Sequence, residues 1–263
     1  MANTIPHILA YPPDYRMAIR LALPLLFCQR RSFRGDAQVW LKGLKPSPII
    51  IGEENIPQKA PFLLVINHYH RQNYKIWWSA LAASALIPVE IHWVMTEAWT
   101  FPNQPWGRLL EAISRQIFRR IAQVYGFFLM PPMPPRPWEI EARARSVRNI
   151  LDNIRKHPDS ALGLAPEGGD SKSGALEIPA PGVGRFLLHL ASLGLPIYPL
   201  GIYEAEAALC LNFGKVIHLN YRSNGTPEER DCWGIRVVMQ ALADLLPLHL
   251  RGVFYGNQSE IRS

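Results

Sequence analysis

Cysteine is scarce in this chain of 263 residues, and the three that are present, Cys28, Cys210 and Cys232, lie far apart. An odd number of widely spaced cysteines gives neither a disulfide framework nor the paired spacing of a zinc site. We therefore expect a protein of a reducing, cytosolic compartment whose fold depends on its apolar core.

Acidic residues are also in the minority, with 21 Asp and Glu against 28 Lys and Arg and a formal net charge of +7. A basic protein is expected to meet an acidic partner, and nucleic acid and anionic lipid headgroups are the usual candidates. Here the arginines are spread over amphipathic segments and are not clustered with aromatic residues. We therefore expect an anionic membrane surface as partner, and no nucleic acid.

Long apolar runs are absent as well. The longest, at positions 76–95, is interrupted by Pro88, Glu90 and His92, so it is expected to form a helix, a turn and a strand, not a membrane span. The apolar segment at 17–28 is short and lacks the small-residue cleavage site of a secretory signal. The expected location is cytoplasmic and peripheral, on the inner face of a membrane.

Short apolar runs alternate with amphipathic segments along the chain. Strands are expected near 49–51, 62–66, 92–96, 126–130, 161–165, 197–202 and 216–219, and helices near 15–31, 74–85, 106–124, 138–156, 182–193 and 226–246. This alternation predicts a single α/β domain, a mixed and mostly parallel sheet with helices on both faces. We place it at 41–250, after a loose N-terminal segment and a helix at 1–40 and before a polar tail at 251–263.

The helix expected at 15–31 is apolar and flanked by four arginines, Arg16, Arg20, Arg30 and Arg31. Such a helix suits the lipid interface, where cations meet anionic headgroups and the apolar face enters the acyl region. A helix that packs on the domain is the alternative. We expect the former, an amphipathic helix that lies on the membrane surface.

The chain is organised around the apolar run at 62–66 and the Asn67-His68 pair that follows it. In an α/β sheet, ligands bind in the crevice outside the carboxyl ends of the strands. A histidine at such a strand end is held rigidly and can be reached by substrate. The alternative is that His68 only caps the following turn.

Two other readings of this histidine are less favoured. His68 and His70 are two residues apart, as in half of a metal site, but Arg71, Gln72 and Asn73 follow and supply no carboxylate or third imidazole. We therefore expect no metal. No Gly-x-Ser-x-Gly motif is present, so a serine hydrolase is not expected.

Four short motifs accompany successive expected strands. They are Asn67-His68, Gly126-Phe-Phe-Leu, Pro166-Glu167-Gly168 and Tyr198-Pro199-Leu200, preceded by Gly52-Glu-Glu-Asn-Ile-Pro. Their order and strand-end placement over about residues 40–220 resemble the glycerolipid (lysophospholipid) acyltransferase superfamily, of the 1-acylglycerol-3-phosphate acyltransferase kind. Its members carry a His-x4-Asp block, a glycine-rich strand that leads to an arginine, a Phe-Pro-Glu-Gly block and a late strand proline.

The resemblance implies transfer of a fatty acyl group, to oxygen or nitrogen, from an acyl-CoA or acyl carrier protein co-substrate to a lipid-like acceptor. No other cofactor is implied. His68 is then the general base for the acceptor, a role that suits the pKa of an imidazole. Glu167 and the Gly168-Gly169 backbone position the acceptor. The implied substrate-binding set is completed by Asn67, Arg71, Asp170, Lys172 and Pro199.

One departure from the family pattern concerns catalysis, because Asn73 stands where the His-x4-Asp block has its aspartate. An Asn oxygen still accepts a hydrogen bond from the imidazole, but it cannot stabilise an imidazolium charge. In a serine-protease triad the same change lowers turnover by about 10⁴-fold. Either Glu167 or Asp170 supplies the carboxylate, or the chain is a weakened or inactive relative that binds acyl-CoA or lipid.

A second departure concerns the acceptor. Pro131 and Asp170 stand where relatives with phosphate-bearing acceptors carry arginines, and neither side chain can bind phosphate as a guanidinium does. We therefore expect an acceptor without a simple phosphate head, such as an amino- or sugar-headed lipid. The cations that could still supply phosphate binding are Arg71, Lys75, Arg136 and Lys172.

Overall fold

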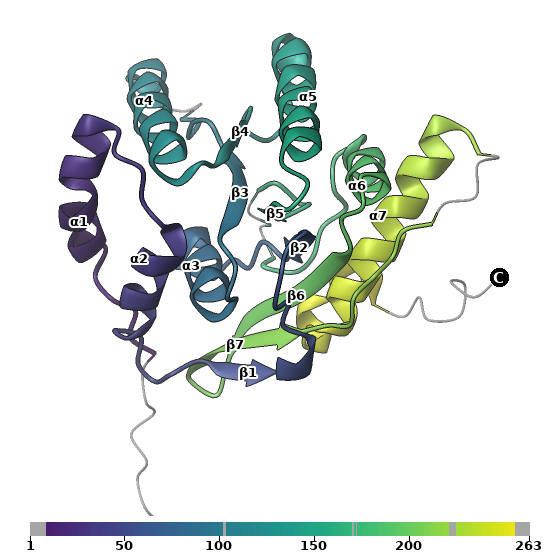
Figure 1. The fold of residues 1–263 in the computed structure, drawn as a ribbon, viewed down its shortest axis with the longest axis horizontal. Coiled ribbons are helices and arrows are strands. Elements are labelled where there is room, and N and C mark those ends of the chain that lie inside the picture. Colours follow the sequence, from purple (N-terminus) through teal and green to yellow (C-terminus); the bar gives the residue numbers. More distant parts are fainter. Residues whose placement is uncertain (1–8, 102–103, 170, 172, 221–224, 256–263) are drawn as a thin grey trace, which may run out of the picture.

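The computed structural model describes residues 9–101, 104–169, 171, 173–220 and 225–255. Within these residues a seven-stranded sheet has the order β1-β7-β6-β2-β5-β3-β4 (Figure 1). The strands are β1 (Ile49–Ile51), β2 (Phe62–Ile66), β3 (Ile91–Thr96), β4 (Phe128–Met130), β5 (Ala161–Leu164), β6 (Ile197–Ala205) and β7 (Ala208–Phe213). The strands from β6 to β4 in this order are parallel, whereas β7 pairs antiparallel with β6 and parallel with β1.

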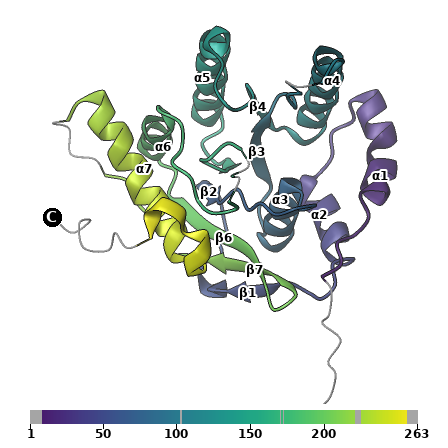
Figure 2. The ribbon, with the colours of Figure 1, turned by 180° about the vertical axis from the view of Figure 1, so that it is seen from behind.

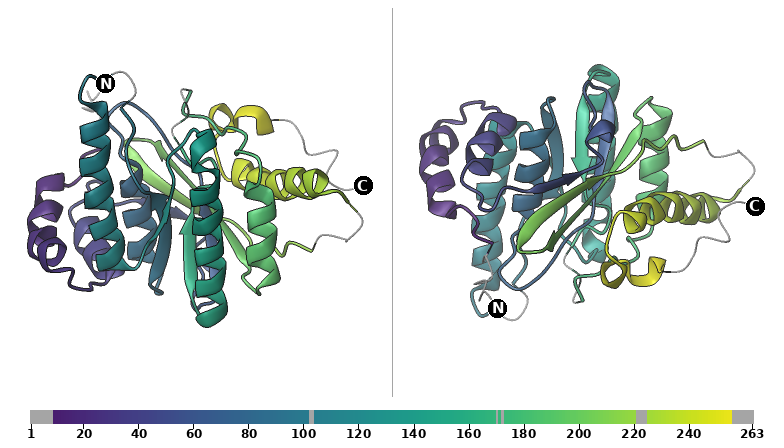
Figure 3. Two further views of the ribbon diagram at one scale, coloured as in Figure 1. Left: turned by 90° about the horizontal axis from the view of Figure 1, so that it is seen from above. Right: turned by 90° about the horizontal axis from the view of Figure 1, so that it is seen from below.

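Helices cover both faces of the sheet, as the alternation of elements predicts. They are α1 (Asp14–Phe27), α2 (Phe33–Leu41), α3 (Ile76–Leu86), α4 (Gly107–Tyr125), α5 (Ile140–Lys156), α6 (Val183–Ser192) and α7 (Pro227–Asp244). Helices α1 to α4 lie on one side and α5 to α7 on the other (Figures 1 and 2). After β2, the strands β3 and β4 are added toward one edge of the sheet, and β5 and β6 are then added in the opposite direction, on either side of β2. Since parallel crossovers are right-handed, this reversal moves the later helices to the opposite face. Figure 3 shows the same two layers from above and below.

Short 3-10 helices at Glu53–Asn55, Pro137–Glu139, Leu248–Leu250 and Gly252–Phe254 complete the described elements. None of the described helices has both the length and the apolar character needed to cross a bilayer.

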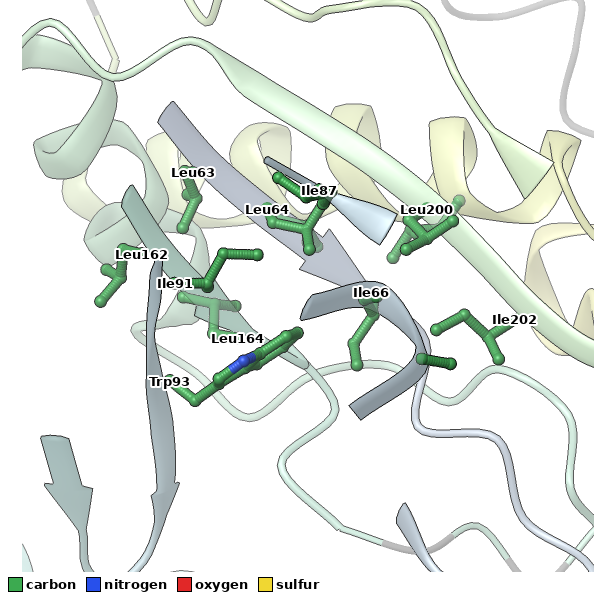
Figure 4. Packing of buried hydrophobic residues seen from close by; sticks show 14 of the residues in the cluster. Leu63, Leu64, Ile66, Ile87, Ile91, Trp93, Leu162, Leu164, Leu200 and Ile202 are labelled. Carbon is green, nitrogen blue, oxygen red and sulfur yellow. The ribbon is translucent and has the colours of Figure 1, made fainter. Parts of the chain in front are cut away.

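The core is centred on β2, whose five residues are all buried because strands lie on both sides and helices on both faces. Figure 4 shows Leu64 and Ile66 of β2 among side chains from β3, β5 and β6. Gly163 of β5 is required here, because a Cβ at this position would lie 2.6 Å from the Trp93 ring. The buried indole N–H of Trp93 donates to Ser84 Oγ at 2.9 Å.

One expected strand is wrong, and one observed strand was not expected. Residues 216–219 form no strand, and only Ile217 makes an isolated bridge with Ile197. Strand β7 pairs instead with an extended β6 through the tight turn at Glu206-Ala207, where both φ angles are positive. Hairpin turns with two positive φ angles usually carry Asn or Gly, so Glu206 and Ala207 do not indicate a turn in the sequence.

The N-terminal region differs from the expected single helix at 15–31. It contains two helices, and the second, α2, packs against α3. Part of the segment expected to be loose is packed: Ala10 bridges to Lys45, and the Tyr11 ring stacks on Trp78 with ring centroids 3.9 Å apart. At the other end Phe254 is buried against α7. Residues near both ends of the described chain therefore contact the α/β domain.

Candidate active site

His68 lies two residues beyond β2, at the centre of the sheet. Strand β2 pairs in parallel with β5, with Val65 opposite Leu164, so the residues that follow the two strands emerge at the same edge. The main-chain N–H of His68 donates to Glu167 Oε2 at 2.6 Å. The structure therefore brings together the histidine and glutamate blocks, which are about a hundred residues apart in sequence.

Asn67 joins this strand end to β6. Its side chain is buried, its Nδ2 donates to the carbonyl of Ile202 at 2.9 Å, and its Oδ1 accepts from the Ile202 N–H at 2.7 Å. This paired contact copies the hydrogen bonds of a strand and fixes the residue immediately before His68. The observed contacts are structural, and a role of Asn67 in substrate binding stays a prediction.

Glu167 is buried and uses both carboxylate oxygens. Oε2 accepts from His68, and Oε1 accepts from the main-chain N–H of Glu177 at 3.2 Å. Burial raises the pKa of Glu167, although the two N–H donors act in the opposite direction. Through its two oxygens the Glu167 side chain connects the His68 backbone, after β2, with its own loop after β5.

Gly168 and Gly169 carry this loop past Met133, in the segment after β4. Gly168 has a φ of 70°, and a Cβ there would lie 3.1 Å from Met133 Cγ; one at Gly169 would lie 3.6 Å from Met133 Cβ. Glycine thus permits both the left-handed backbone and the close approach. The other two predicted residues of this loop, Asp170 and Lys172, lie outside the described residues.

Asn73 is exposed and has a φ of 65°, a conformation that Asn and Asp adopt more readily than most residues. It lines a small cleft of about 320 Å³ together with Arg71 and Trp78, and His68 is not among the described residues of its wall. The fold therefore places Glu167 beside His68 and Asn73 on the wall of this separate cleft.

Arg71 is held by Glu204 at the end of β6. Its Nε and Nη2 both donate to that carboxylate, the latter at 2.7 Å, while Nη1 donates to the carbonyl of Gln72 at 2.7 Å. The Tyr11 hydroxyl donates to the same carboxylate at 2.5 Å. Glu204 and Tyr11 were not predicted from the sequence, because neither belongs to a motif and the contact joins distant parts of the chain.

Pro199 lies within β6, next to Val65 of β2, and is buried. Its carbonyl accepts from the Gly214 N–H at 2.9 Å. The late strand proline is therefore one strand away from the strand that carries His68, and its predicted role in substrate binding remains a prediction.

A larger cleft of about 750 Å³ lies beside this site, and it was not predicted either. Its described wall comes from the loop after β3, the start of α4 and the loop after β4: Thr100, Phe101, Gln104, Pro105, Trp106, Gly107, Arg108, Leu109, Glu111, Met133, Pro134 and Arg136. Met133 belongs both to this wall and to the contact with Gly168. The cleft therefore adjoins the Glu167-Gly168 loop.

The charges on this wall are largely matched within the protein. Arg136 donates to both oxygens of Glu111, at 3.1 and 3.3 Å, and also to Glu139. These carboxylates raise the pKa of the guanidinium. What remains of the wall is mostly apolar, which suits a hydrocarbon chain.

The structure is thus an α/β protein in which a histidine at the carboxyl end of a central parallel strand is held to a Pro-Glu-Gly loop beside a mostly apolar cleft. The family model described as Acyltransferase matches residues 48–203, more than half of the chain. The chain belongs to the acyltransferase family, which confirms the resemblance seen in the sequence.

The chain is also similar to a solved structure and to a curated protein. Among solved structures, the chain is similar to the 1-acyl-sn-glycerophosphate (LPA) acyltransferase PlsC from Thermotoga maritima, with 15% identity and a TM-score of 0.47 over 89% of this chain and 83% of that chain. Among curated proteins, it is similar to PRAME family member 12 of Homo sapiens, 27% identical over 99 residues. That match covers 38% of this chain and 20% of the human protein, so the chain matches about a fifth of that relative.

Proposed function

We propose that this protein transfers a fatty acyl group from acyl-CoA or acyl carrier protein to a hydroxyl or amine of a lipid-like acceptor. Membership of the acyltransferase family supports the class of reaction. The observation that carries the proposal is the 2.6 Å bond that fixes the His68 backbone to Glu167 at the carboxyl edge of the sheet. A base must be held in one place to meet its substrate in a productive geometry.

In the proposed reaction, His68 accepts a proton from the acceptor hydroxyl or amine as that atom attacks the thioester carbonyl. A bond forms between the nucleophile and the carbonyl carbon, and the carbon–sulfur bond of the tetrahedral intermediate then breaks. The proton held by His68 passes to the departing thiolate. General-base assistance of this kind contributes about 10²–10⁴-fold to rate. Glu167 acts as a positioning residue, since both its oxygens contact main-chain N–H groups.

The 750 Å³ cleft is the proposed place for the acyl chain. Phe101, Trp106 and Met133 give it an apolar wall, and Met133 connects it to the loop that holds His68. Each methylene removed from water contributes about 0.8 kcal/mol. A chain seated here would end near the strand edge where the transfer takes place.

The proposed acceptor has no simple phosphate head. Pro131 offers no charge, and two cations that could substitute for the family arginines are occupied: Arg71 binds Glu204 and Arg136 binds Glu111. A guanidinium paired with a carboxylate must lose that partner before it binds phosphate. An amino- or sugar-headed lipid avoids this cost.

We place the protein on the cytoplasmic face of an anionic membrane. Helix α1 exposes Ile19, Leu23 and Leu26, and arginines surround it in the sequence. This arrangement supports the interfacial reading of the helix.

The test is a measurement of thiol release from acyl-CoA and from acyl carrier protein, with phosphorylated and unphosphorylated lipid acceptors in parallel. We expect acceptor-dependent release that falls at least ~10²-fold in His68→Gln. His218→Gln, at an exposed histidine away from the site, is the matched control and should keep wild-type turnover.

Two results would overturn parts of the proposal. A clear preference for the phosphorylated acceptor would contradict the acceptor class. If the wild type binds acyl-CoA without turnover and only the Asn73→Asp variant turns over, the protein is a binding module on this fold. Asn73 in place of the family aspartate is the feature that favours this alternative.

A further inference from the structure

Helix α4 leaves an apolar stripe uncovered. Leu109, Leu110, Ile113 and Ile117 are 56%, 37%, 49% and 47% exposed, and their spacing of three and four residues places them on one face. Phe118, which follows Ile117, is buried and lies on a different side of the helix from this stripe. Contiguous exposed apolar surface of this kind is uncommon in a soluble protein and marks a contact with a partner or a membrane.

The charges of helix α4 favour an anionic partner. Its exposed charges are Arg108 and Arg119, which the helical repeat places on the polar side, away from the stripe. Glu111, the single acidic residue of the helix, is bound to Arg115 at 2.8 Å and to Arg136 at 3.1 Å. A helix with an apolar face and unopposed arginines matches the boundary of an anionic bilayer, where apolar side chains and cations have separate places.

Helix α1 lies alongside and repeats the pattern. The two helices are side by side in Figures 1 and 3 and are joined where α1 ends: the Arg31 N–H donates to the Val124 carbonyl at 3.0 Å, and Arg120 Nη1 contacts Cys28 Sγ at 2.7 Å. Ile19, Leu23 and Leu26 of α1 are exposed, and so is Arg30 just after the helix, whereas Arg20 and Arg31 are paired with Asp36. Exposed apolar side chains near an exposed arginine therefore recur on the helix beside α4.

The stripe also leads to the large cleft. Leu109 belongs both to the stripe and to the cleft wall, and Trp106, 71% exposed, precedes the helix on the same wall. Tryptophan is favoured at the headgroup level of a bilayer. A membrane in contact with the stripe therefore also lies against this end of the cleft.

We propose that α4 docks on an anionic bilayer through Leu110, Ile113 and Ile117, with the cleft opening toward the lipid at the start of the helix. The inference rests on the proposed membrane-surface location and adds a docking element separate from α1. It gives a lipid substrate a route from the bilayer into the cleft that does not expose its chain to water.

The experiment is flotation of the full chain with vesicles of phosphatidylglycerol and phosphatidylcholine, and with vesicles of phosphatidylcholine alone. The test variant is Leu110→Gln/Ile113→Gln/Ile117→Gln. The matched control replaces three exposed apolar residues elsewhere, Ile178→Gln/Leu248→Gln/Val253→Gln. We expect the partition coefficient on the anionic vesicles to fall at least ~10-fold for the test variant and to stay within about twofold for the control. Circular dichroism melts confirm that both variants fold.

Each contrary outcome has a distinct meaning. Unchanged vesicle binding by the α4 variant overturns α4 docking and leaves the membrane location standing, whereas failure of the wild type to bind overturns both. If the wild type is a dimer in solution and the variant a monomer with unchanged vesicle binding, the stripe belongs to a second copy. Thiol release with a short-chain, water-soluble acceptor tests the reaction independently of docking.

Discussion

The main-chain N–H of His68 and the carboxylate of Glu167, 99 residues apart in sequence, form a 2.6 Å hydrogen bond at the carboxyl edge of the sheet. The bond joins the ends of two neighbouring parallel strands, β2 and β5. The backbone of the predicted base is therefore held by a buried acidic residue. The contribution of this residue can be measured from the pH dependence of stability, and from the melting temperature and turnover of variants in its loop.

The first prediction concerns the pH dependence of stability. Burial raises the pKa of Glu167 above its usual 4.5, so ionisation is less favourable in the folded than in the unfolded chain. The stabilising contribution is complete below the unfolded pKa and is lost as pH rises through the folded pKa. Relative to Glu167→Gln, the wild type should therefore lose free energy of unfolding across that interval.

Urea unfolding of the wild type and Glu167→Gln at a series of pH values from about 4 to about 8 measures this difference. Glu141→Gln, at an exposed position on α5, provides the control for loss of a carboxylate. A constant difference between wild type and Glu167→Gln at every pH would contradict the assignment.

The second prediction concerns the loop that carries Glu167. Gly168→Ala should cost at least ~1 kcal/mol, because it places a Cβ in left-handed backbone and 3.1 Å from Met133. Gly194 also has a positive φ, but a Cβ added there would have no atom within 4 Å. Gly194→Ala therefore measures the cost of the backbone conformation without a steric contact. We expect the Gly168 variant to melt lower than the Gly194 variant and to lose turnover, which Gly194→Ala should retain. Equal melting temperatures would show that the Met133 contact is easily relieved.

The third prediction concerns Asn73. Aspartate tolerates the same left-handed conformation, so Asn73→Asp should leave thermal stability within about 0.5 kcal/mol of wild type. If the side chain acts on the imidazole during turnover, the added charge stabilises the imidazolium and kcat rises at least ~10-fold. Steady-state thiol release measures this. An unchanged kcat, with stability also unchanged, would mean that Asn73 takes no part in the proton transfer.

The fourth prediction concerns the pair of Arg71 and Glu204. Glu204→Gln removes the charge that opposes the guanidinium, so KM for a phosphate-headed acceptor should fall roughly 2- to 10-fold, since partly exposed ion pairs contribute about 1 kcal/mol. KM for an uncharged acceptor should stay the same, which separates this effect from general loosening of the loop. Equal changes for both acceptors would place Arg71 outside the acceptor site.

Much of the site was predictable because its motifs are local. The apolar run that ends at Asn67-His68 and the later Pro166-Glu167-Gly168 each identify a strand end, and strand ends of a parallel sheet share one edge. The pairings Arg71 with Glu204 and Arg136 with Glu111 were not predictable, because no spacing in the sequence brings these charges within bonding distance. They bear on the proposed acceptor, because two of the cations that could bind a phosphate are already paired with carboxylates.

The same limit applies to the elements. The hairpin of β6 and β7 turns at Glu206-Ala207, residues with no turn preference, so its left-handed backbone is imposed by the pairing of the two strands. Pairing across the sheet stabilises a local conformation that the residues themselves do not favour.

The sequence by itself determined the α/β alternation, the central buried strand and the family blocks around His68, because each is encoded in the periodicity and identity of neighbouring residues. Only the tertiary structure decided that β5 lies beside β2, that Glu167 holds the His68 backbone and that Leu110, Ile113 and Ile117 face outward. These features depend on distances between segments far apart in the chain, and such distances are fixed when the helices and strands pack together.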